Sequence, residues 1–304
     1  TFIDSIQRYV HKGRIHSEIN QLRSDQGGTV SGRLSYSNPN LQQIPARNKE
    51  FGNKIRSLFL PEEGKQWGSF DYSQQEPRLV AHYAASTNEN FTGADDFIKA
   101  YHDEAADFHQ IVADMAGISR TNAKTINLGL FYGMGKAKLA RELGISKDAA
   151  ENLLNKYHTR VPFVKRLAEA VTNSASKYGF IRTVKGRKCR FNMWEPATFG
   201  MNKAMQYTEA KATYGNNIRR AFTYKALNRL IQGSAADQTK QAMINCYKAG
   251  FQPLLQIHDE LCFSINEESD IIKVKEVMEN AIEELKVPFK VDLALGRSWG
   301  EAKE

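Results

Sequence analysis

Two acidic turns far apart in the chain each follow a run of residues typical of a β-strand. Residues 66–70 lead into Asp71, and residues 254–257 lead into His258-Asp259-Glu260, after which residues 261–265 continue like the second arm of a hairpin. A carboxylate at a strand end is held rigidly and still reaches the edge of the sheet. The pattern therefore predicts a sheet, with acidic side chains at the ends of its strands.

If the two strands are neighbours, Asp71 and Asp259 can bridge two Mg²⁺ ions about 4 Å apart. Such a pair activates a nucleophilic oxygen and steadies a leaving phosphate. In the competing interpretation, Asp71 caps the following helix and Asp259-Glu260 is a solvated turn. Taken alone, acidic residues at strand ends favour this second interpretation.

A cationic stripe lies between the acidic turns. Arg120, Lys124, Leu128 and Tyr132 are spaced by four and share one face of a predicted helix, with Ser119 as its N-cap. The stripe is about 18 Å long at about 1.5 Å per residue, comparable with a nucleoside triphosphate. An ordinary amphipathic helix with two solvated cations is the alternative.

Four blocks of the sequence, in this order and spacing, resemble the family A DNA polymerases, the DNA polymerase I family. The blocks are residues 29–35 with 39–45, residues 71–78, residues 120–133, and residues 232–237 followed by 258–260. The resemblance runs from Tyr9 to residues 296–300. It implies an α+β, right-hand polymerase fold with an antiparallel palm sheet and a helical fingers subdomain. Thumb and exonuclease domains are absent from this chain, which opens in mid-pattern and predicts a longer parent protein.

The resemblance implies a template-directed DNA polymerase that extends a primer 3′ end by two-metal-ion phosphoryl transfer with pyrophosphate release. Its partners would be primer–template DNA and deoxynucleoside triphosphates, and its location intracellular. Asp71 and Asp259 would bind two Mg²⁺ ions, with the carbonyl of Tyr72 as a further ligand. Glu260 is assigned as a nearby, less essential catalytic acid.

The resemblance also assigns the nucleotide site. Arg120 and Lys124 would bind the triphosphate, and Lys124 would protonate or neutralise the departing pyrophosphate. His109 would face the phosphates, although a lone histidine is more often a packing or surface residue. Glu76 would close the pocket at the sugar 2′ position, with Gln74 beside it. Leu128 and Tyr132 complete the assigned set.

Five polar residues map to primer and template contacts in the family: Arg33, Asn40, Asn228, Gln232 and His258. The minor groove offers nearly the same acceptors for every base pair, so donors there test pair shape without reading sequence. Turn or capping duty is the alternative for Asn40 and Asn228.

Three positions depart from the family pattern. Leu128 stands where Phe or Tyr is usual, so an aliphatic surface replaces an aromatic ring. Pro77 replaces a usual Leu and is tolerable only in the first turn of the helix after Asp71. Gln43 stands where Asn is usual.

Composition agrees with a nucleic-acid partner. The chain has 304 residues, 41% of them hydrophobic, and a formal net charge of +8. A mean hydropathy of −0.53 argues against membrane spans. A basic cluster at residues 182–190 is expected near DNA backbone, with a solvated face as the alternative. Three cysteines without paired spacing argue against zinc.

The patterning predicts three segments. Residues 1–90 form the first part of the palm with a primer–template binding loop, residues 91–224 form the fingers, and residues 225–304 complete the palm. Within the last segment, apolar residues from Ile271 to Leu285 predict a helix packed on the sheet.

Two other functions compete with DNA synthesis. A single-subunit RNA polymerase shares the palm and the two-metal chemistry, but Glu76 as a 2′ gate and residues 232–234 favour deoxynucleotides. A DNA-binding module without catalysis is disfavoured because Asp71, Lys124 and Asp259 are all present.

Overall fold

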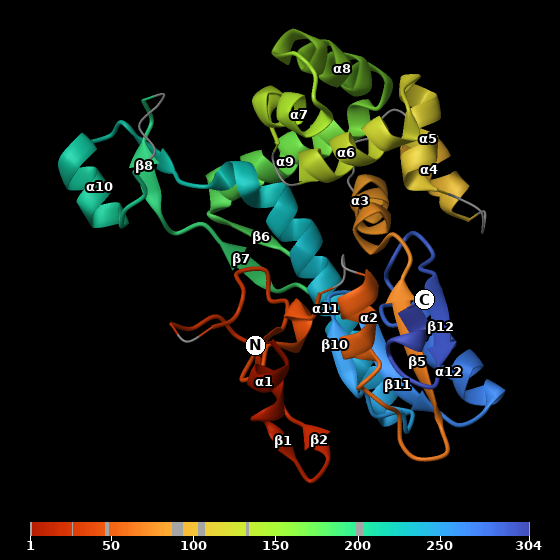
Figure 1. The fold of residues 1–304 in the computed structure, drawn as a ribbon. Helices are drawn as coiled ribbons and strands as arrows, with labels where there is room; N and C mark the ends of the chain where they lie inside the picture. Colours follow the sequence, from red (N-terminus) through yellow and green to blue (C-terminus); the bar gives the residue numbers. More distant parts are fainter. Residues whose placement is uncertain are drawn as a thin grey trace. The chain divides into compact units, whose positions relative to one another are not determined.

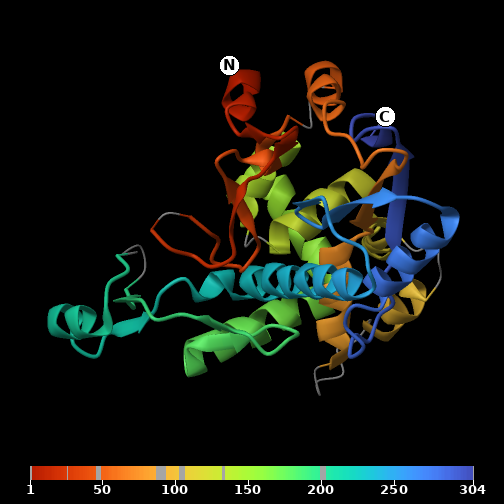
Figure 2. The ribbon, with the colours of Figure 1, turned by 90° about the horizontal axis from the view of Figure 1, so that it is seen from below.

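The computed structural model describes residues 2–25, 27–45, 49–86, 94–102, 107–131, 134–198 and 203–303. Backbone contacts divide the chain into two compact units, residues 1–75 with 235–304 and residues 76–234. Figures 1 and 2 show the fold from two directions. The boundaries between the units fall inside two helices, whereas the predicted palm and fingers meet at residues 90 and 224. The units are defined by packing alone, so the palm and fingers assignments stay predictions.

A four-stranded antiparallel sheet is the centre of the first unit. Its strands, in spatial order, are β10 (Leu255–Ile257), β11 (Glu260–Ile265), β5 (Gln66–Tyr72) and β12 (Val291–Gly296). Phe70 and Phe263, fully buried, pack edge to face with ring centroids 5.7 Å apart. The observed mixture of helices and antiparallel sheet confirms the predicted α+β class.

The remaining elements of this unit are short. They are α1 (Phe2–Gln7), β1 (Val10–His11), β2 (Arg14–Ile15), β3 (Glu18–Asn20), β4 (Ser35–Ser37), η1 (Leu41–Gln43), α2 (Lys49–Arg56), α12 (Glu268–Glu279) and η3 (Glu301–Lys303). Val274 and Met278 are buried on α12 as predicted, but the helix ends at Glu279, where the Asn280 N–H bonds back to Glu276. Ile282 and Leu285 therefore lie beyond the helix that was predicted to carry them.

Trp299 anchors the C-terminal segment to the sheet. Its ring is 2% exposed, stacks on Trp67 at 6.2 Å and meets the Phe59 ring edge-on at 5.6 Å. The Arg56 guanidinium lies 5.1 Å from the Trp299 ring. Burying an aromatic ring of this size is worth about 2–3 kcal/mol, so the η3 turn that follows is held firmly against the strands.

The second unit is mostly helical. It contains α4 (Ala94–Tyr101), α5 (Phe108–Ala116), α6 (Arg120–Phe131), α7 (Lys136–Leu143), α8 (Lys147–Arg160), α9 (Pro162–Tyr178), α10 (Tyr207–Tyr214) and η2 (Thr223–Lys225), with most of α3 (Gln75–Ser86) and the first part of α11 (Ala226–Lys248). Two antiparallel ribbons accompany them: β6 (Phe180–Arg182) with β7 (Lys188–Arg190), and β8 (Trp194–Pro196) with β9 (Ile218–Arg220).

Local hydrogen bonds and backbone conformation account for several helix ends. The Ser119 hydroxyl accepts from the Asn122 N–H at 3.2 Å, and the Ser146 hydroxyl caps α8 by accepting from Ala149 at 3.1 Å. Gly179 ends α9 in the left-handed region at φ +76°. Pro77 is the third residue of α3, inside the first turn as its chemistry requires. No helix in the described ranges is both long and apolar enough to cross a membrane.

Candidate active site

The two acidic turns meet at one end of the sheet. Strands β5 and β11 are antiparallel neighbours, with Asp71 directly opposite Glu260, and the Tyr72 N–H points at the Asp259 carbonyl at 3.4 Å. A two-residue turn joins β10 to β11, and His258 adopts the left-handed region there at φ +55°. The strand that ends near Asp71 and the hairpin that carries Asp259 are therefore neighbours, which the strand pattern alone could not decide.

Asp71 does not cap a helix, because it lies within β5 and α3 begins only at Gln75. Burial, reinforced by the charges of Asp259 and Glu260, raises the pKa of Asp71 to about 7. Burial likewise raises the pKa of Asp259. Asp71 Oδ1 is buried and accepts no hydrogen bond from the described residues. Nearby cations, Lys303 for Asp71 and Arg33 for Asp259, therefore offset only part of the effect that raises these two pKa values.

Glu260 differs from its two acidic neighbours because it has a cation of its own. Its carboxylate is 8% exposed and pairs with the Lys303 ammonium at 3.1 Å. The Cys262 thiol also donates to it, with an Sγ to Oε1 distance of 3.4 Å. The sequence did not predict the role of Lys303, because no pattern near the C-terminal segment indicates an ion pair with a residue of β11.

A further acid, Asp292 on β12, lies opposite Asp71 on the other side of β5 and is exposed. Its negative charge also acts on Asp71 and contributes to the raised pKa. The sequence reasoning did not single it out, although its alternation with buried Val291 marks an outward-facing position. In the described part of the chain, no three His, Cys, Asp or Glu side chains form a ready metal cluster.

Three of the five predicted DNA-contact residues belong to the same unit as the carboxylates. Arg33 and His258 line one small hollow with Gln256, whose amide nitrogen donates to the His258 carbonyl at 2.5 Å. The positive charge of Arg33 offsets part of the burial effect on the Asp259 pKa. Asn40 caps η1, with its side-chain oxygen accepting from the Gln42 N–H at 3.1 Å. Asn40 thus caps a helix, which was the alternative considered to a contact with DNA.

Tyr72 and Gln74 follow directly after Asp71. The Tyr72 ring is buried, and its hydroxyl donates to the Met278 carbonyl at 2.7 Å, which fixes the end of β5 on α12. Gln74 turns the chain in the left-handed region at φ +53°. Gln75 then donates to Gln238 at 3.1 Å and to Thr239 at 3.2 Å. This network holds the backbone that carries Asp71.

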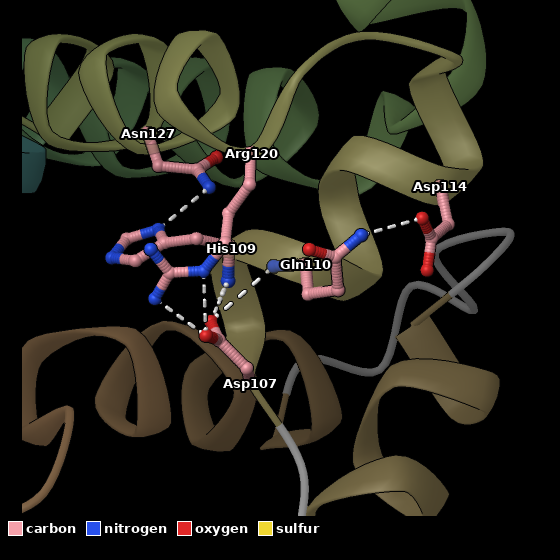
Figure 3. A network of polar contacts seen from close by, with 6 residues as sticks. All are labelled: Asp107, His109, Gln110, Asp114, Arg120 and Asn127. Atoms are coloured by element: carbon pink, nitrogen blue, oxygen red, sulfur yellow. Dashed lines mark hydrogen bonds and ion pairs between the residues drawn. The ribbon is translucent and has the colours of Figure 1, made fainter.

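The second unit contains a separate polar network, drawn in Figure 3. Arg120, the first residue of α6, donates from Nε and Nη2 to Asp107 Oδ2 at 2.8 and 2.6 Å. Asp107 is also the N-cap of α5 and accepts from the N–H groups of His109 and Gln110. Partial burial alone would raise the pKa of Asp107, but these hydrogen bonds lower it. The ion pair with Asp107 therefore fixes the position of the Arg120 side chain, which is about half exposed.

His109 is fixed by a buried chain of hydrogen bonds. The Tyr157 hydroxyl donates to Asn127 Oδ1 at 2.6 Å, and Asn127 Nδ2 lies 3.2 Å from His109 Nδ1. Asn127 then donates to Nδ1, which places the proton of the neutral imidazole on Nε2. Burial, assisted by the nearby charges of Lys124 and Arg120, lowers the pKa of His109 in spite of Asp107. The ring therefore offers a neutral N–H donor at neutral pH.

Two of the four stripe residues can be followed to the side chain. Arg120 and Lys124 lie one turn apart on α6, and both are exposed. The side chain of Leu128 and the whole of Tyr132 lie outside the described residues. Glu76, in the first turn of α3, is half-buried and belongs to the same unit as Arg120.

Asn228 and Gln232 lie one turn apart on α11. Asn228 Nδ2 is buried and makes no hydrogen bond within the described residues, so it is an available donor. Ser234, which follows Gln232 closely in the sequence, is held in place by hydrogen bonds. Ser234 is fully buried, contacts the Tyr83 hydroxyl at 2.6 Å and accepts from the Val184 N–H at 3.1 Å.

Comparison with known proteins gives one answer throughout. The sequence profile of DNA polymerase family A matches residues 1–301. A DNA-directed DNA polymerase of Pseudomonas phage M6 is 37% identical over 99% of this chain and 49% of its own length. DNA polymerase I of Lactococcus lactis is 37% identical over 98% of this chain and 32% of its own.

A solved structure agrees with the sequence relatives. The POL domain of Pol1 from M. smegmatis, in complex with DNA primer-template and dNTP, superposes with a TM-score of 0.78 at 33% identity. The match covers 99% of this chain and 51% of that one. The chain thus spans about half or less of the length of these relatives. With the profile matched almost end to end and the acidic strand ends side by side in the fold, the chain belongs to DNA polymerase family A.

Proposed function

We propose that this chain is the catalytic region of a template-directed DNA polymerase that adds deoxynucleotides to a primer 3′ end and releases pyrophosphate. The observation that carries the proposal is the half-buried carboxylate pair, Asp71 and Asp259, at the end of neighbouring strands. Two neighbouring, half-buried anions that are only partly compensated are costly unless further cations join them. Phosphoryl transfer supplies both the cations and the phosphates that share them.

Mg²⁺ fits the donor set at this strand end. It prefers oxygen ligands and needs only one or two protein carboxylates, since substrate phosphates and water complete its shell. Asp71 and Asp259 would hold two ions together with the Tyr72 carbonyl, and the orphaned Asp71 Oδ1 is a ready ligand. Bound there, the ions would activate the primer oxygen and stabilise the leaving phosphate.

Glu260 has a lesser role in this proposal because Lys303 already neutralises it. The pair keeps a third carboxylate from competing for the ions, and the Trp299 anchor keeps Lys303 in place. Lys303 is thus a positioning residue that acts through Glu260. This arrangement supports assigning the metals to Asp71 and Asp259 alone.

The nucleotide would be held by the second unit. Arg120 would bind the triphosphate tail, His109 would donate its Nε2–H to a phosphate oxygen, and Lys124 would neutralise the leaving pyrophosphate. Glu76, with Gln74 near it in sequence, would close the pocket at the sugar 2′ carbon. Leu128 and Tyr132 would pack on the sugar and base.

The paired bases would be checked from the minor groove by Arg33, Asn40, Asn228, Gln232 and His258. The buried, unsatisfied Asn228 amide supports this for one member, because a donor in that state gains most from a ligand acceptor. The assignments of palm to residues 1–90 and 225–304, and of fingers to residues 91–224, belong to the same proposal.

A primer-extension assay with Mg²⁺ tests the function. Four templates that differ in the first unpaired base should each direct addition of the complementary deoxynucleotide, and ribonucleotides should add much more slowly. Asp71→Ala protein serves as the matched control for contaminating polymerase. Addition that ignores the template, or equal use of ribonucleotides, would contradict DNA-templated DNA synthesis.

A further inference from the structure

Three polar side chains from three helices form a chain of hydrogen bonds inside the second unit. Tyr157 of α8 and Asn127 of α6 are fully buried, and His109 of α5 is 7% exposed. The Tyr157 hydroxyl lies 2.6 Å from Asn127 Oδ1, and Asn127 Nδ2 lies 3.2 Å from His109 Nδ1. Helix α5 packs against both α6 and α8, so the three side chains meet within one packed core.

Tyr157 sets the direction of this hydrogen-bond chain. Its hydroxyl has a single hydrogen, and burial raises the pKa of the phenol, so the group remains a donor at neutral pH. Asn127 Oδ1 accepts that hydrogen, and the Asn127 amide nitrogen is thereby turned to His109 Nδ1. If the amide were reversed, the phenol would face an N–H group and its hydrogen would lose its acceptor. Such a loss is costly for a buried donor, so the reversed amide is disfavoured.

The orientation of the Asn127 amide decides which nitrogen of His109 carries a proton. An amide N–H at Nδ1 requires a lone pair on that atom, so the proton of the neutral ring lies on Nε2. An amide oxygen at the same place would require the proton on Nδ1 instead. Figure 3 shows Nδ1 turned toward Asn127 and the other ring nitrogen turned away from it. The hydrogen-bond chain therefore opposes both the other tautomer and the doubly protonated ring.

The charged groups around the His109 ring act in opposite directions. Burial lowers the pKa of His109 most, Asp107 at the start of α5 raises it, and Lys124 and Arg120 of α6 lower it further. The group that α8 contributes, the Tyr157 phenol, is neutral. Two cations near the ring already supply positive charge, so the property that His109 can add is a hydrogen bond of fixed direction.

A contact that only joins two helices does not need this arrangement. The Tyr72 hydroxyl, for comparison, donates to the backbone carbonyl of Met278, which has no side-chain orientation to control. The Tyr157 hydroxyl instead orients a buried amide, and the amide orients a titratable ring. Burying Asn127 removes its amide from water at a cost that an apolar side chain would not incur. What the amide provides in return is control over the protonation of His109.

We propose that Asn127 and Tyr157 are positioning residues of the nucleotide site, and this inference rests on the proposed polymerase function. They act through His109, which they hold as a neutral imidazole with its proton on Nε2. In that form His109 donates to a phosphate oxygen of the nucleoside triphosphate, while Arg120 and Lys124 supply the positive charge. The other neutral tautomer would turn a lone pair on Nε2 toward the phosphate oxygens and repel them.

The first test locates the proton and does not require catalysis. The protein is labelled with nitrogen-15 in its histidine rings and followed by NMR over a series of pH values, and His109→Gln identifies the His109 signals. The parent should carry the proton of the neutral ring on Nε2. Asn127→Asp, which presents an oxygen to Nδ1, should move that proton to Nδ1 and raise the proton affinity of the ring at least about 10-fold. Tyr157→Phe, which frees the amide to reverse, should raise the proton affinity about 3-fold or more.

Tyr101→Phe is the matched control. It also removes a phenol hydroxyl from a buried tyrosine of the second unit, and the Tyr101 ring stacks on Phe108, the neighbour of His109 in sequence. It should change the proton affinity of His109 by less than about 2-fold. A proton on Nδ1 in the parent, or a ring unchanged by both Asn127→Asp and Tyr157→Phe, would overturn the proposal. Thermal melting checks that each variant is folded, and if Asn127→Asp does not fold, Tyr157→Phe decides.

The second test connects the proton to nucleotide binding. The apparent Kd for a non-hydrolysable deoxynucleotide is measured on the complex with primer–template at about pH 7 and about pH 9. Over this range Asn127→Asp should lose at least about 5-fold in affinity relative to the parent, because its ring, once neutral, has no proton on Nε2. In the His109→Gln background, Asn127→Asp should show no such pH dependence. The same pH dependence in both backgrounds would mean that Asn127 does not act through His109.

The two tests separate this inference from the proposed function. If the parent extends primers and the ring of His109 is unaffected by Asn127→Asp and Tyr157→Phe, the inference is wrong and the polymerase function stands. If the two variants move the proton as expected but the parent extends no primer and binds no deoxynucleotide, the polymerase function is wrong. The role of His109 in nucleotide binding then fails with it, whereas the control of its protonation by Asn127 and Tyr157 stands.

Discussion

The acid-bearing unit and the cation-bearing unit solve opposite electrostatic problems. Asp71 and Asp259 are half-buried anions whose raised pKa values indicate that the cations of the protein compensate them only in part. Arg120 is an exposed cation that already has an internal anion, Asp107, as its partner. The comparison teaches that the proposed metal site is incomplete without added cations, whereas the proposed phosphate-binding residue Arg120 is already held in place by Asp107.

The largest expected effect comes from removing one of the two half-buried anions. Asp71→Asn should slow single-turnover nucleotide addition by at least about 10³-fold, equivalent to about 4 kcal/mol, because a metal ligand is lost. The melting temperature should not fall, since the substitution also removes repulsion from Asp259 and Glu260. Asp292→Asn, opposite Asp71 but exposed, is the matched control and should cost less than about 3-fold. Similar losses for the two variants would mean that position in the sheet, and not burial, decides.

The next effect sharpens the description of the cation site. Lys124→Ala should lower the maximal rate of addition by about 10²-fold, because it meets charge that develops on the leaving group. Arg120→Ala should mainly raise the apparent Kd for the nucleotide, since Arg120 meets charge present before reaction. Rapid-quench kinetics over a range of nucleotide concentrations separates the two. A change in apparent Kd alone for Lys124→Ala would remove its role in the chemical step.

The acid site should also make metal-free stability depend on pH. The folded pKa of Asp71, about 7, lies above its ordinary value of 3.8, so the folded protein holds a proton that the unfolded chain releases between those values. In EDTA, the free energy of unfolding of the parent should therefore fall by about 2–3 kcal/mol as pH rises from 4 to 7. In Asp71→Asn this contribution to the pH dependence should be absent. Chemical denaturation at a series of pH values measures it. If the contribution of Asp71 to the free energy of unfolding instead grew with pH, the folded state would not raise the pKa of Asp71, and this explanation would be wrong.

The smallest expected effect concerns Glu260, the acid that pairs with Lys303. Lys303→Met should lower the rate about 10-fold and raise the Mg²⁺ concentration for half-maximal rate, because the freed Glu260 carboxylate competes with Asp71 and Asp259. Lys303→Arg should restore both, since it keeps the charge. In the double variant with Glu260→Gln, the Mg²⁺ requirement should return to normal. An unchanged requirement in Lys303→Met would reduce the pair to a structural contact.

The sequence predicted features that depend on short spacing. The strand-like runs on either side of His258-Asp259-Glu260 predicted a hairpin, and the Ser119 hydroxyl predicted a helix start; the structure confirms both. Each signal is contained within a few residues. Joining β5 to β11 required the family resemblance, because pairing between distant strands leaves no local trace.

The contacts that set the electrostatics were beyond the sequence for the same reason. Lys303 reaches Glu260 only because Trp299 anchors the C-terminal segment, and Asn127 reaches His109 only because Tyr157 orients its amide. The Asp107–Arg120 pair joins two helices whose packing no periodicity specifies. Such partners are fixed by tertiary packing. The end of α12 at Glu279, earlier than the apolar spacing predicted, is instead made locally by the Asn280 N–H, which donates to the Glu276 carbonyl.

Direct measurement of metal binding tests the central claim, that Asp71 and Asp259 are the cation-binding carboxylates and Glu260 is not. Mn²⁺ can replace Mg²⁺ and be followed by electron paramagnetic resonance in the presence of primer–template and a non-hydrolysable nucleotide. We expect Asp71→Asn and Asp259→Asn each to weaken Mn²⁺ binding by at least about 10-fold, and Glu260→Gln to change it by less than about 2-fold. Binding lost in Glu260→Gln and retained in Asp71→Asn would contradict the account.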